Sequence, residues 1–61
     1  MPVFEVFVDG EVRHVCADGW RADGDEVVFY DRLVDPKTGQ PEIEVARVVI
    51  VDPERNIIYV P

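Results

Sequence analysis

Apolar and polar residues alternate along much of the chain, and the apolar ones are mostly β-branched or aromatic. Leu33 is the only leucine, and Gly or Pro recurs at short intervals. Short β-branched runs separated by turn residues are typical of antiparallel strands. The pattern therefore predicts a single all-β domain over residues 1–61. We expect a five-stranded meander that forms a small, partly open barrel of the SH3-like or Sm-like type.

The first two predicted strands, at about 3–8 and 11–17, are joined by Asp9-Gly10. Asp-Gly between apolar runs favours a type I′ hairpin turn, which needs positive φ at both central residues. A two-residue loop makes Val8 face Glu11 and Val3 face Cys16, and residues directly opposite share a face. Neither face is clearly the exposed one: the first carries Phe4, Val6, Val8, Glu11, Arg13, Val15 and Ala17, and the second carries Val3, Glu5, Phe7, Val12, His14 and Cys16.

A second hairpin is predicted around Asp23-Gly24, in a register where Ala22 faces Asp25 and Trp20 faces Val27. Because a small core needs large side chains, we expect the only tryptophan to belong to the core. Alternation then assigns the two faces of the hairpin. The core face carries Trp20, Val27 and Phe29, and the opposite face carries Arg21, Glu26, Val28 and Tyr30.

In the second half of the chain, the third predicted strand ends and two more strands follow. The third strand reaches toward Val34, and residues 35–41, DPKTGQP, form a polar connector that we expect to be a mobile loop. The fourth strand covers about 42–51, where β-branched residues argue against a helix. It ends in the apolar run 48–51, which predicts burial on both faces. Residues 52–56 predict a tight turn or one turn of 3₁₀ helix before a last strand at 57–60.

Thirteen acidic residues against six basic ones give a net charge of −7. The arginines are scattered between acids, so nucleic acid is not an expected partner. Cys16 is the only cysteine, which rules out an intramolecular disulfide. No apolar run has the length of a membrane span, and the first residues lack a signal-peptide pattern. We therefore expect a cytoplasmic protein that does not contact membranes.

Two long segments carry a family resemblance. VFVDGEVRHVCADGWRADGDEVVFYD at 6–31 and VARVVIVDPERNIIYV at 45–60 resemble small uncharacterised β-rich proteins of actinobacteria and their phages. Those proteins show the same succession of strands, Asp-Gly turns, a Trp near the second turn, and a Val-Ala strand. The resemblance implies a fold but no activity, cofactor or catalytic residue.

One group of residues suggests chemistry. In the predicted register, Glu5, His14 and Cys16 share one face of the first hairpin. An imidazole beside a thiol and a carboxylate is suited to an activated cysteine or to a metal site. The alternative is an ordinary cross-strand pair beside a small apolar cysteine. A chain of this size has little room for a substrate cleft, so we expect no enzyme, no metal and no cofactor.

The remaining candidates concern binding. Phe7, Arg21 and Tyr30 are the predicted partner contacts, because alternation places them opposite the expected core. We expect a non-enzymatic protein-interaction module, of a phage-encoded or accessory kind. An alternative is an acidic nucleic-acid mimic that inhibits a host protein. The acids that could form such a mimic are Asp18, Asp23, Asp25, Glu26, Asp31 and Asp35.

A homodimer is also expected, because so short a β-chain gains little net stability as a monomer. The predicted contacts are the first hairpin or the apolar end of the fourth strand. Pairing of exposed strand edges is the simplest geometry for such a dimer.

Overall fold

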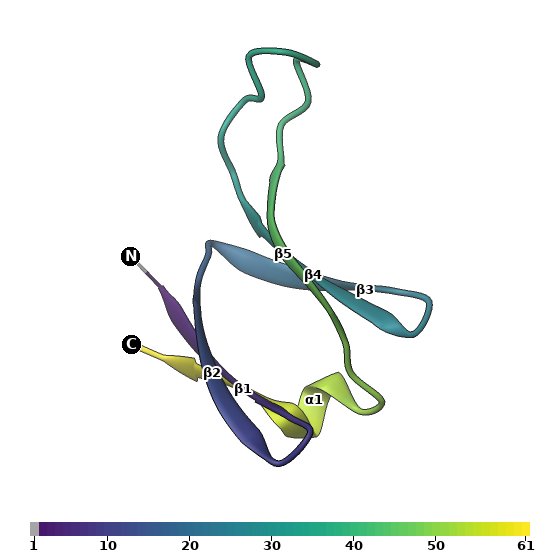
Figure 1. Ribbon diagram of the computed structural model, residues 1–61. Helices are drawn as coiled ribbons and strands as arrows, with labels where there is room; N and C mark the ends of the chain where they lie inside the picture. Colours follow the sequence, from purple (N-terminus) through teal and green to yellow (C-terminus); the bar gives the residue numbers. More distant parts are fainter. Residues whose placement is uncertain (1) are drawn as a thin grey trace.

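The computed structural model describes residues 2–61 and confirms the all-β prediction (Figure 1). The strands form two three-stranded antiparallel sheets, in the orders β2-β1-β6 and β3-β4-β5. The elements are β1 (Val3–Val8), β2 (Glu11–Cys16), β3 (Gly19–Asp23), β4 (Glu26–Asp31), β5 (Ile43–Val49), α1 (Pro53–Asn56) and β6 (Ile57–Val60).

The described chain has six strands, so the expectation of five was wrong. The additional strand is β3, because Ala17 and Asp18 form a corner that leads the chain from one sheet into the other. At this corner the Ala17 amide donates to the Pro2 carbonyl at 3.2 Å, and the Asp18 amide donates to the Tyr30 carbonyl at 2.9 Å. Each corner residue is therefore hydrogen-bonded to a different sheet.

The register of the first hairpin is confirmed. Val8 pairs with Glu11 and Val3 with Cys16. The turn residues Asp9 and Gly10 have φ of 53° and 74°, as a type I′ turn requires.

The register predicted for the second hairpin was wrong by two residues. Trp20 pairs with Phe29 rather than Val27, because the turn is Gly24–Asp25 and not Asp23–Gly24. Only Gly24 has positive φ here, at 64°, which fits a turn with glycine in its first central position. A slip of two residues keeps every side chain on its own face, so the predicted division of the faces holds.

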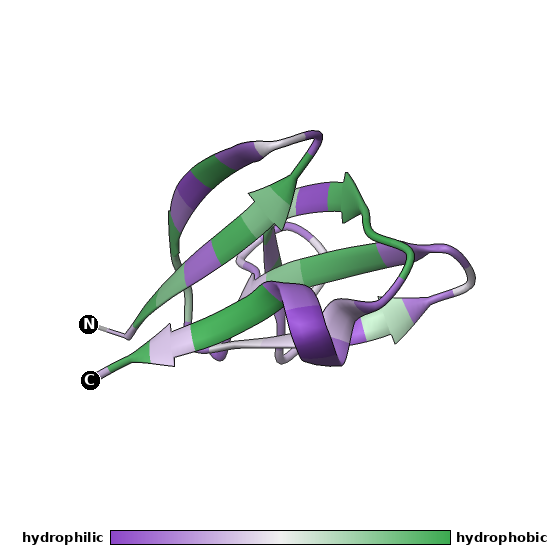
Figure 2. Cartoon of the chain, turned by 90° about the horizontal axis from the view of Figure 1, so that it is seen from below, coloured by the Kyte–Doolittle hydropathy of each residue, from purple (hydrophilic) through white to green (hydrophobic). Residues whose placement is uncertain are grey.

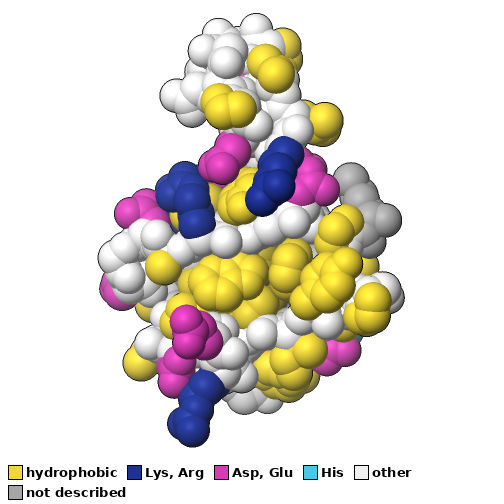
Figure 3. Space-filling view, turned by 180° about the vertical axis from the view of Figure 1, so that it is seen from behind, with side chains coloured by type: hydrophobic (Ala, Val, Ile, Leu, Met, Phe, Trp, Pro, Cys, Tyr) yellow, Lys and Arg dark blue, Asp and Glu magenta, His cyan; other side chains and the backbone are white. Residues whose placement is uncertain are grey.

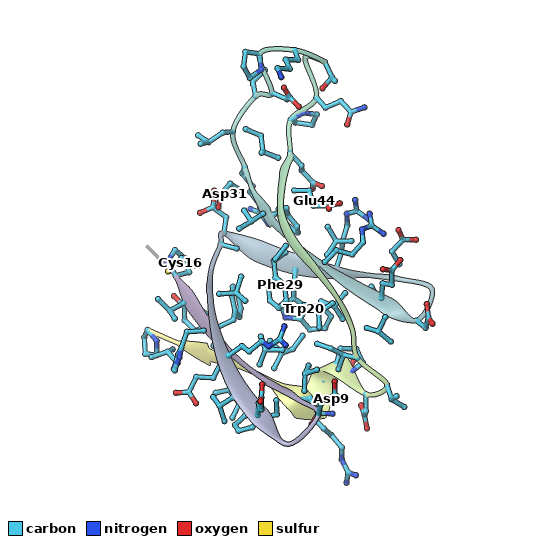
Figure 4. The ribbon with its side chains drawn as sticks, in the orientation of Figure 1. Asp9, Cys16, Trp20, Phe29, Asp31 and Glu44 are labelled. Atoms are coloured by element: carbon cyan, nitrogen blue, oxygen red, sulfur yellow. The ribbon has the colours of Figure 1, made fainter. Side chains whose placement is uncertain are left out.

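The core lies between the two sheets. It consists of the side chains of Phe4, Val6, Ala17, Val27, Phe29, Ile50 and Ile57, with Val8, Val15, Trp20, Ala46 and Val48 packed against it. The first-hairpin face that begins with Phe4 is thus the buried one. The Phe4 ring contacts those of Phe29 and Tyr59, with centroid distances of 5.8 and 5.6 Å. Trp20 points inward beside Phe29 but remains half-buried (Figure 4).

The end of β5 differs from the prediction. Residues 48–51 are not buried on both faces: Ile50 is buried, whereas Val49 and Val51 are 57 % and 96 % exposed. The strand ends at Val49, and the chain then alternates once more before Asp52 and Pro53 turn it into α1. A helical turn does occur within 52–56, but it is the α-helical turn α1 rather than the predicted tight turn or 3₁₀ turn.

The segment between β4 and β5 projects from the body of the molecule (Figure 1). β4 ends at Asp31, so the predicted extension to Val34 was wrong. Backbone hydrogen bonds link the Asp35 amide to the Gln40 carbonyl and the Gly39 amide to the Asp35 carbonyl. Within residues 2–61, no helix is long and apolar enough to cross a membrane.

Candidate functional site

Exposed apolar side chains are unevenly distributed over the surface. From behind, hydrophobic side chains gather in a band across the middle of the molecule, with charged side chains above and below (Figure 3). Large exposed apolar residues occur on both sheets and in the projecting loop: Phe7, Val12, Leu33, Val34, Val45, Val49, Val51, Ile58 and Tyr59. Clustered exposed apolar groups mark contact surfaces more often than scattered ones do.

A hollow lies where the first hairpin turn approaches the end of β5, and we call it the end groove. Its volume is about 420 Å³. It is lined by Phe7, Val8, Asp9, Gly10, Val49, Ile50, Val51 and Asn56. Asp9 lies at the tip of the first hairpin, beside α1 (Figure 4). The groove thus combines the first hairpin turn with residues 49–56, which are distant from it in the sequence.

Local structure explains why apolar side chains are exposed at the groove. The buried Ile50 fixes this part of the chain, and its amide donates to the Asp25 carbonyl at 3.3 Å. Because side chains alternate in extended chain, anchoring Ile50 turns its two neighbours outward. Val49 and Val51 therefore face solvent, together with Phe7, which is 37 % exposed.

The charges near the groove are acidic. Asp9 lines it, Asp25 is bonded through its backbone to Ile50, and Asp52 follows Val51 directly. In the described part of the chain, no basic side chain forms a salt bridge with Asp9 or Asp25. Asp52 has only a 3.9 Å contact with an exposed arginine. The groove therefore combines exposed apolar side chains with one acid, Asp9, that has no salt-bridge partner in residues 2–61.

The predicted contacts Phe7, Arg21 and Tyr30 do not come together. Phe7 lines the end groove, whereas Arg21 and Tyr30 line a second hollow of about 230 Å³ next to the projecting loop. Arg21 forms a 3.5 Å ion pair with Glu42 there. The Tyr30 ring packs across Gly19: a Cβ on this glycine would lie 2.7 Å from the Tyr30 hydroxyl.

The Tyr30 ring also interacts with Arg32, whose guanidinium carbon lies 5.9 Å from the ring centroid. The contact with the Tyr30 side chain raises the pKa of Arg32. Both Arg21 and Tyr30 thus have partners within the chain, whereas Phe7 forms no ring–ring contact within residues 2–61.

Arg47 is a structural residue that the sequence did not single out. Its guanidinium contacts Glu44 at 2.9 Å, Asp23 at 3.1 Å and Glu26 at 3.2 Å. These hydrogen bonds raise the pKa of Arg47 above its ordinary value, and the bond with Glu44 contributes most. Arg47 therefore stays charged. Arg47 therefore links all three strands of the β3-β4-β5 sheet and, with Arg21, flanks the buried Val28 on the outer side of that sheet.

Glu5, His14 and Cys16 share one face of the first hairpin, as the register predicted. His14 Nε2 lies 4.0 Å from Glu5 Oε1, and both side chains are partly exposed. Cys16 is exposed at the far end of β2 from the Asp9 turn (Figure 4). Among residues 2–61, no group of three or more His, Cys, Asp or Glu side chains is arranged to hold a metal ion.

Most acids of the proposed mimic are engaged in the fold. The Asp18 carboxylate accepts from the Arg32 amide at 2.7 Å, Asp31 accepts from the Asp18 amide, and Asp35 accepts from the Lys37 amide. Asp23 and Glu26 bind Arg47. These bonds give the acids structural roles at turns and corners, which lowers the support for phosphate mimicry.

Sequence reasoning missed the groove residues Val49, Val51 and Asn56. The apolar run at 48–51 suggested burial, but Asp52-Pro53 directly after it was a signal that the strand ends there. At the end of β5 only the inner face of the chain is covered by the core. Ile50 is therefore buried, and Val49 and Val51 on either side of it are exposed.

The chain was compared with known proteins. No protein-family model, no curated protein and no solved structure matches it. Its function must therefore be inferred from the chemistry of its own surface.

Proposed function

We propose that this chain is a non-enzymatic protein-interaction module and that the end groove is its contact site. The observation that carries the proposal is the exposure of Phe7, Val49 and Val51 around one hollow of about 420 Å³. Small-ligand and peptide sites are typically concave and mostly apolar, with a few polar groups that orient the partner. The groove is concave and combines the apolar side chains of Phe7, Val49 and Val51 with polar groups at Asp9 and Asn56.

Its charge indicates the kind of partner. Asp9 lines the groove and has no salt-bridge partner in residues 2–61, in a chain of net charge −7. Complementary charge steers association and disfavours like-charged partners. The occupant is a protein segment that presents one large apolar side chain flanked by basic residues.

The fold proposed for this module is a small barrel of the SH3-like or Sm-like type. Supporting features are the corner at Ala17–Asp18, which joins β2 and β3 of different sheets, and the helical turn α1 directly before β6. In such a barrel, the turns at one end are free to form a binding surface while the sheets hold the core.

Two synthetic peptides of equal length test the function. One carries a leucine flanked by arginines, and the other carries glutamates in place of the arginines. We expect calorimetry to detect binding of the first peptide only, with an affinity that falls as salt rises. Val51→Ser should weaken binding about fivefold, because it removes apolar contact area. Asp9→Asn, which suits the same turn, should weaken it about two- to fivefold.

Val45→Ser is the matched control. Val45 is an exposed valine of β5, the strand that leads to Val51, but it does not line the groove. Equal binding of both peptides, or equal losses for Val45→Ser and Val51→Ser, would contradict the proposal.

A further inference from the structure

The outer face of the β2-β1-β6 sheet is unusually apolar. Residues that pair directly share a face, and the register therefore defines this outer face as Val3, Glu5, Phe7, Val12, His14, Cys16, Ile58 and Val60. Figure 2 shows hydrophobic colouring along most of the strands next to the two termini. Antiparallel sheets with one face in solvent normally alternate apolar and polar residues. This sheet is apolar on both sides.

The apolar residues of this face are accessible. Phe7 is 37 % exposed, Val12 50 % and Ile58 48 %, and they come from all three strands. Neither the helix α1 nor the projecting loop supplies a buried partner for them in residues 2–61. The face is therefore a surface that a second molecule can cover.

The charges on the face point to what covers it. Apart from Cys16, only Glu5 and His14 on this face have ionisable side chains. Their side chains lie 4.0 Å apart on paired positions of β1 and β2. The face holds one of the thirteen acids of a chain with net charge −7. Twelve of the thirteen acids lie outside this face, so a basic partner finds little to recognise here.

We propose that the outer face binds the same face of a second copy of this chain about a two-fold axis. In a two-fold contact, if one residue of the first copy touches a second residue of the other copy, the reverse contact also occurs. Glu5 of one copy can then lie opposite His14 of the other, twice, while the apolar side chains pack around them. One acid and one imidazole side by side make the face complementary to itself.

The size of the face sets the expected affinity. Three strands about 4.8 Å apart and six residues long give a surface of about 15 by 20 Å. This is smaller than the roughly 800 Å² per partner of a standard stable interface. The dimer is therefore weak, with a dissociation constant on the order of 100 µM.

Sedimentation equilibrium of the full chain tests the proposal at concentrations from about 20 µM to 1 mM, which lie below and above the expected dissociation constant. We expect a concentration-dependent monomer–dimer equilibrium in the wild type. Ile58→Lys and Val12→Lys should each raise the dissociation constant at least about tenfold, because they place like charges in the contact. Val45→Lys, a similarly exposed valine on the other sheet, should leave it unchanged.

A charge exchange adds a readout that a purely apolar contact would not give. His14→Glu should weaken the dimer because two carboxylates then face each other, and His14→Glu combined with Glu5→Lys should restore it. Circular dichroism of each variant confirms that the fold is kept. Because Val12, Ile58 and His14 do not line the end groove, loss of the dimer and loss of peptide binding are separate results.

Hydrogen exchange distinguishes face packing from edge pairing. Edge pairing between copies would protect the outward amides of β2 or β6, the two edge strands of this sheet, as concentration rises, whereas face packing leaves them exchanging. A monomer at every concentration, protection of the β2 or β6 edge amides, or an equal effect of Val45→Lys would overturn the proposal.

Discussion

Two phenylalanines on strands of this small protein have opposite environments. Phe29 is fully buried between the sheets, next to Phe4, whereas Phe7 is 37 % exposed at the end groove. Their residue types are identical, so burial alone decides what each contributes. Large side chains in a core this small carry most of its stability.

Phe29→Ala should therefore destabilise the fold by about 3–5 kcal/mol, enough to unfold much of so small a domain. Phe7→Ala should cost less than about 1 kcal/mol, because the ring is partly in solvent already. Urea unfolding followed by tryptophan fluorescence measures both. Similar losses for the two variants would mean that Phe7 belongs to the core.

The burial of some residues, but not of others, could be predicted from the sequence. The inward positions of Phe4, Val6 and Phe29 follow from alternation and were predicted as one face of each hairpin. The burial of Val28 was not, because it depends on Arg21 and Arg47 from neighbouring strands, and pairing between distant strands is not encoded locally. The ionic contacts of Arg47 have the same origin.

At the scale of elements, the two Asp-Gly turns behave differently. Asp9-Gly10 adopts the expected turn, while at the second position the chain places Gly24 first and Asp25 second. The sequence Asp-Gly-Asp permits either choice. The structure selects the one that pairs Trp20 with Phe29, so core packing fixed the register that the local pattern left open.

Gly24→Ala should destabilise the chain by about 1–2 kcal/mol, because alanine at a positive φ of 64° is strained. No atom lies near enough to obstruct the added methyl group, so the conformation itself is the cause. Asp25→Ala, in the same turn without positive φ, should cost less than about 0.5 kcal/mol. Thermal unfolding of both variants measures the difference, and equal costs would show that the turn assignment is wrong.

The corner between β2 and β3 depends on Asp18. Its carboxylate accepts from the Arg32 amide at 2.7 Å and so ties the corner to the start of the projecting loop. Asp18→Ala should destabilise by about 1 kcal/mol and speed hydrogen exchange at the Arg32 amide. Asp18→Asn keeps an acceptor oxygen and should restore most of the protection. Unchanged exchange in Asp18→Ala would contradict this role.

At the scale of the whole molecule, two sheets of three strands bury a small core and leave two apolar surfaces uncovered. The end groove and the outer face of the β2-β1-β6 sheet meet at Phe7. The sequence predicted contacts at the first hairpin and at the end of the fourth strand, but not that these regions meet in space. Their position depends on how the two sheets pack, which no local pattern specifies.

The central claim is that the end groove is the contact site of a binding module. Amide chemical shifts of the wild type, titrated with the arginine-flanked leucine peptide, test it most directly. The account predicts concentration-dependent changes at residues 7–10, 49–51 and 56, with small changes in the projecting loop. Changes centred on the projecting loop or on the second hollow at Arg21 and Tyr30, or no changes at all, would contradict it.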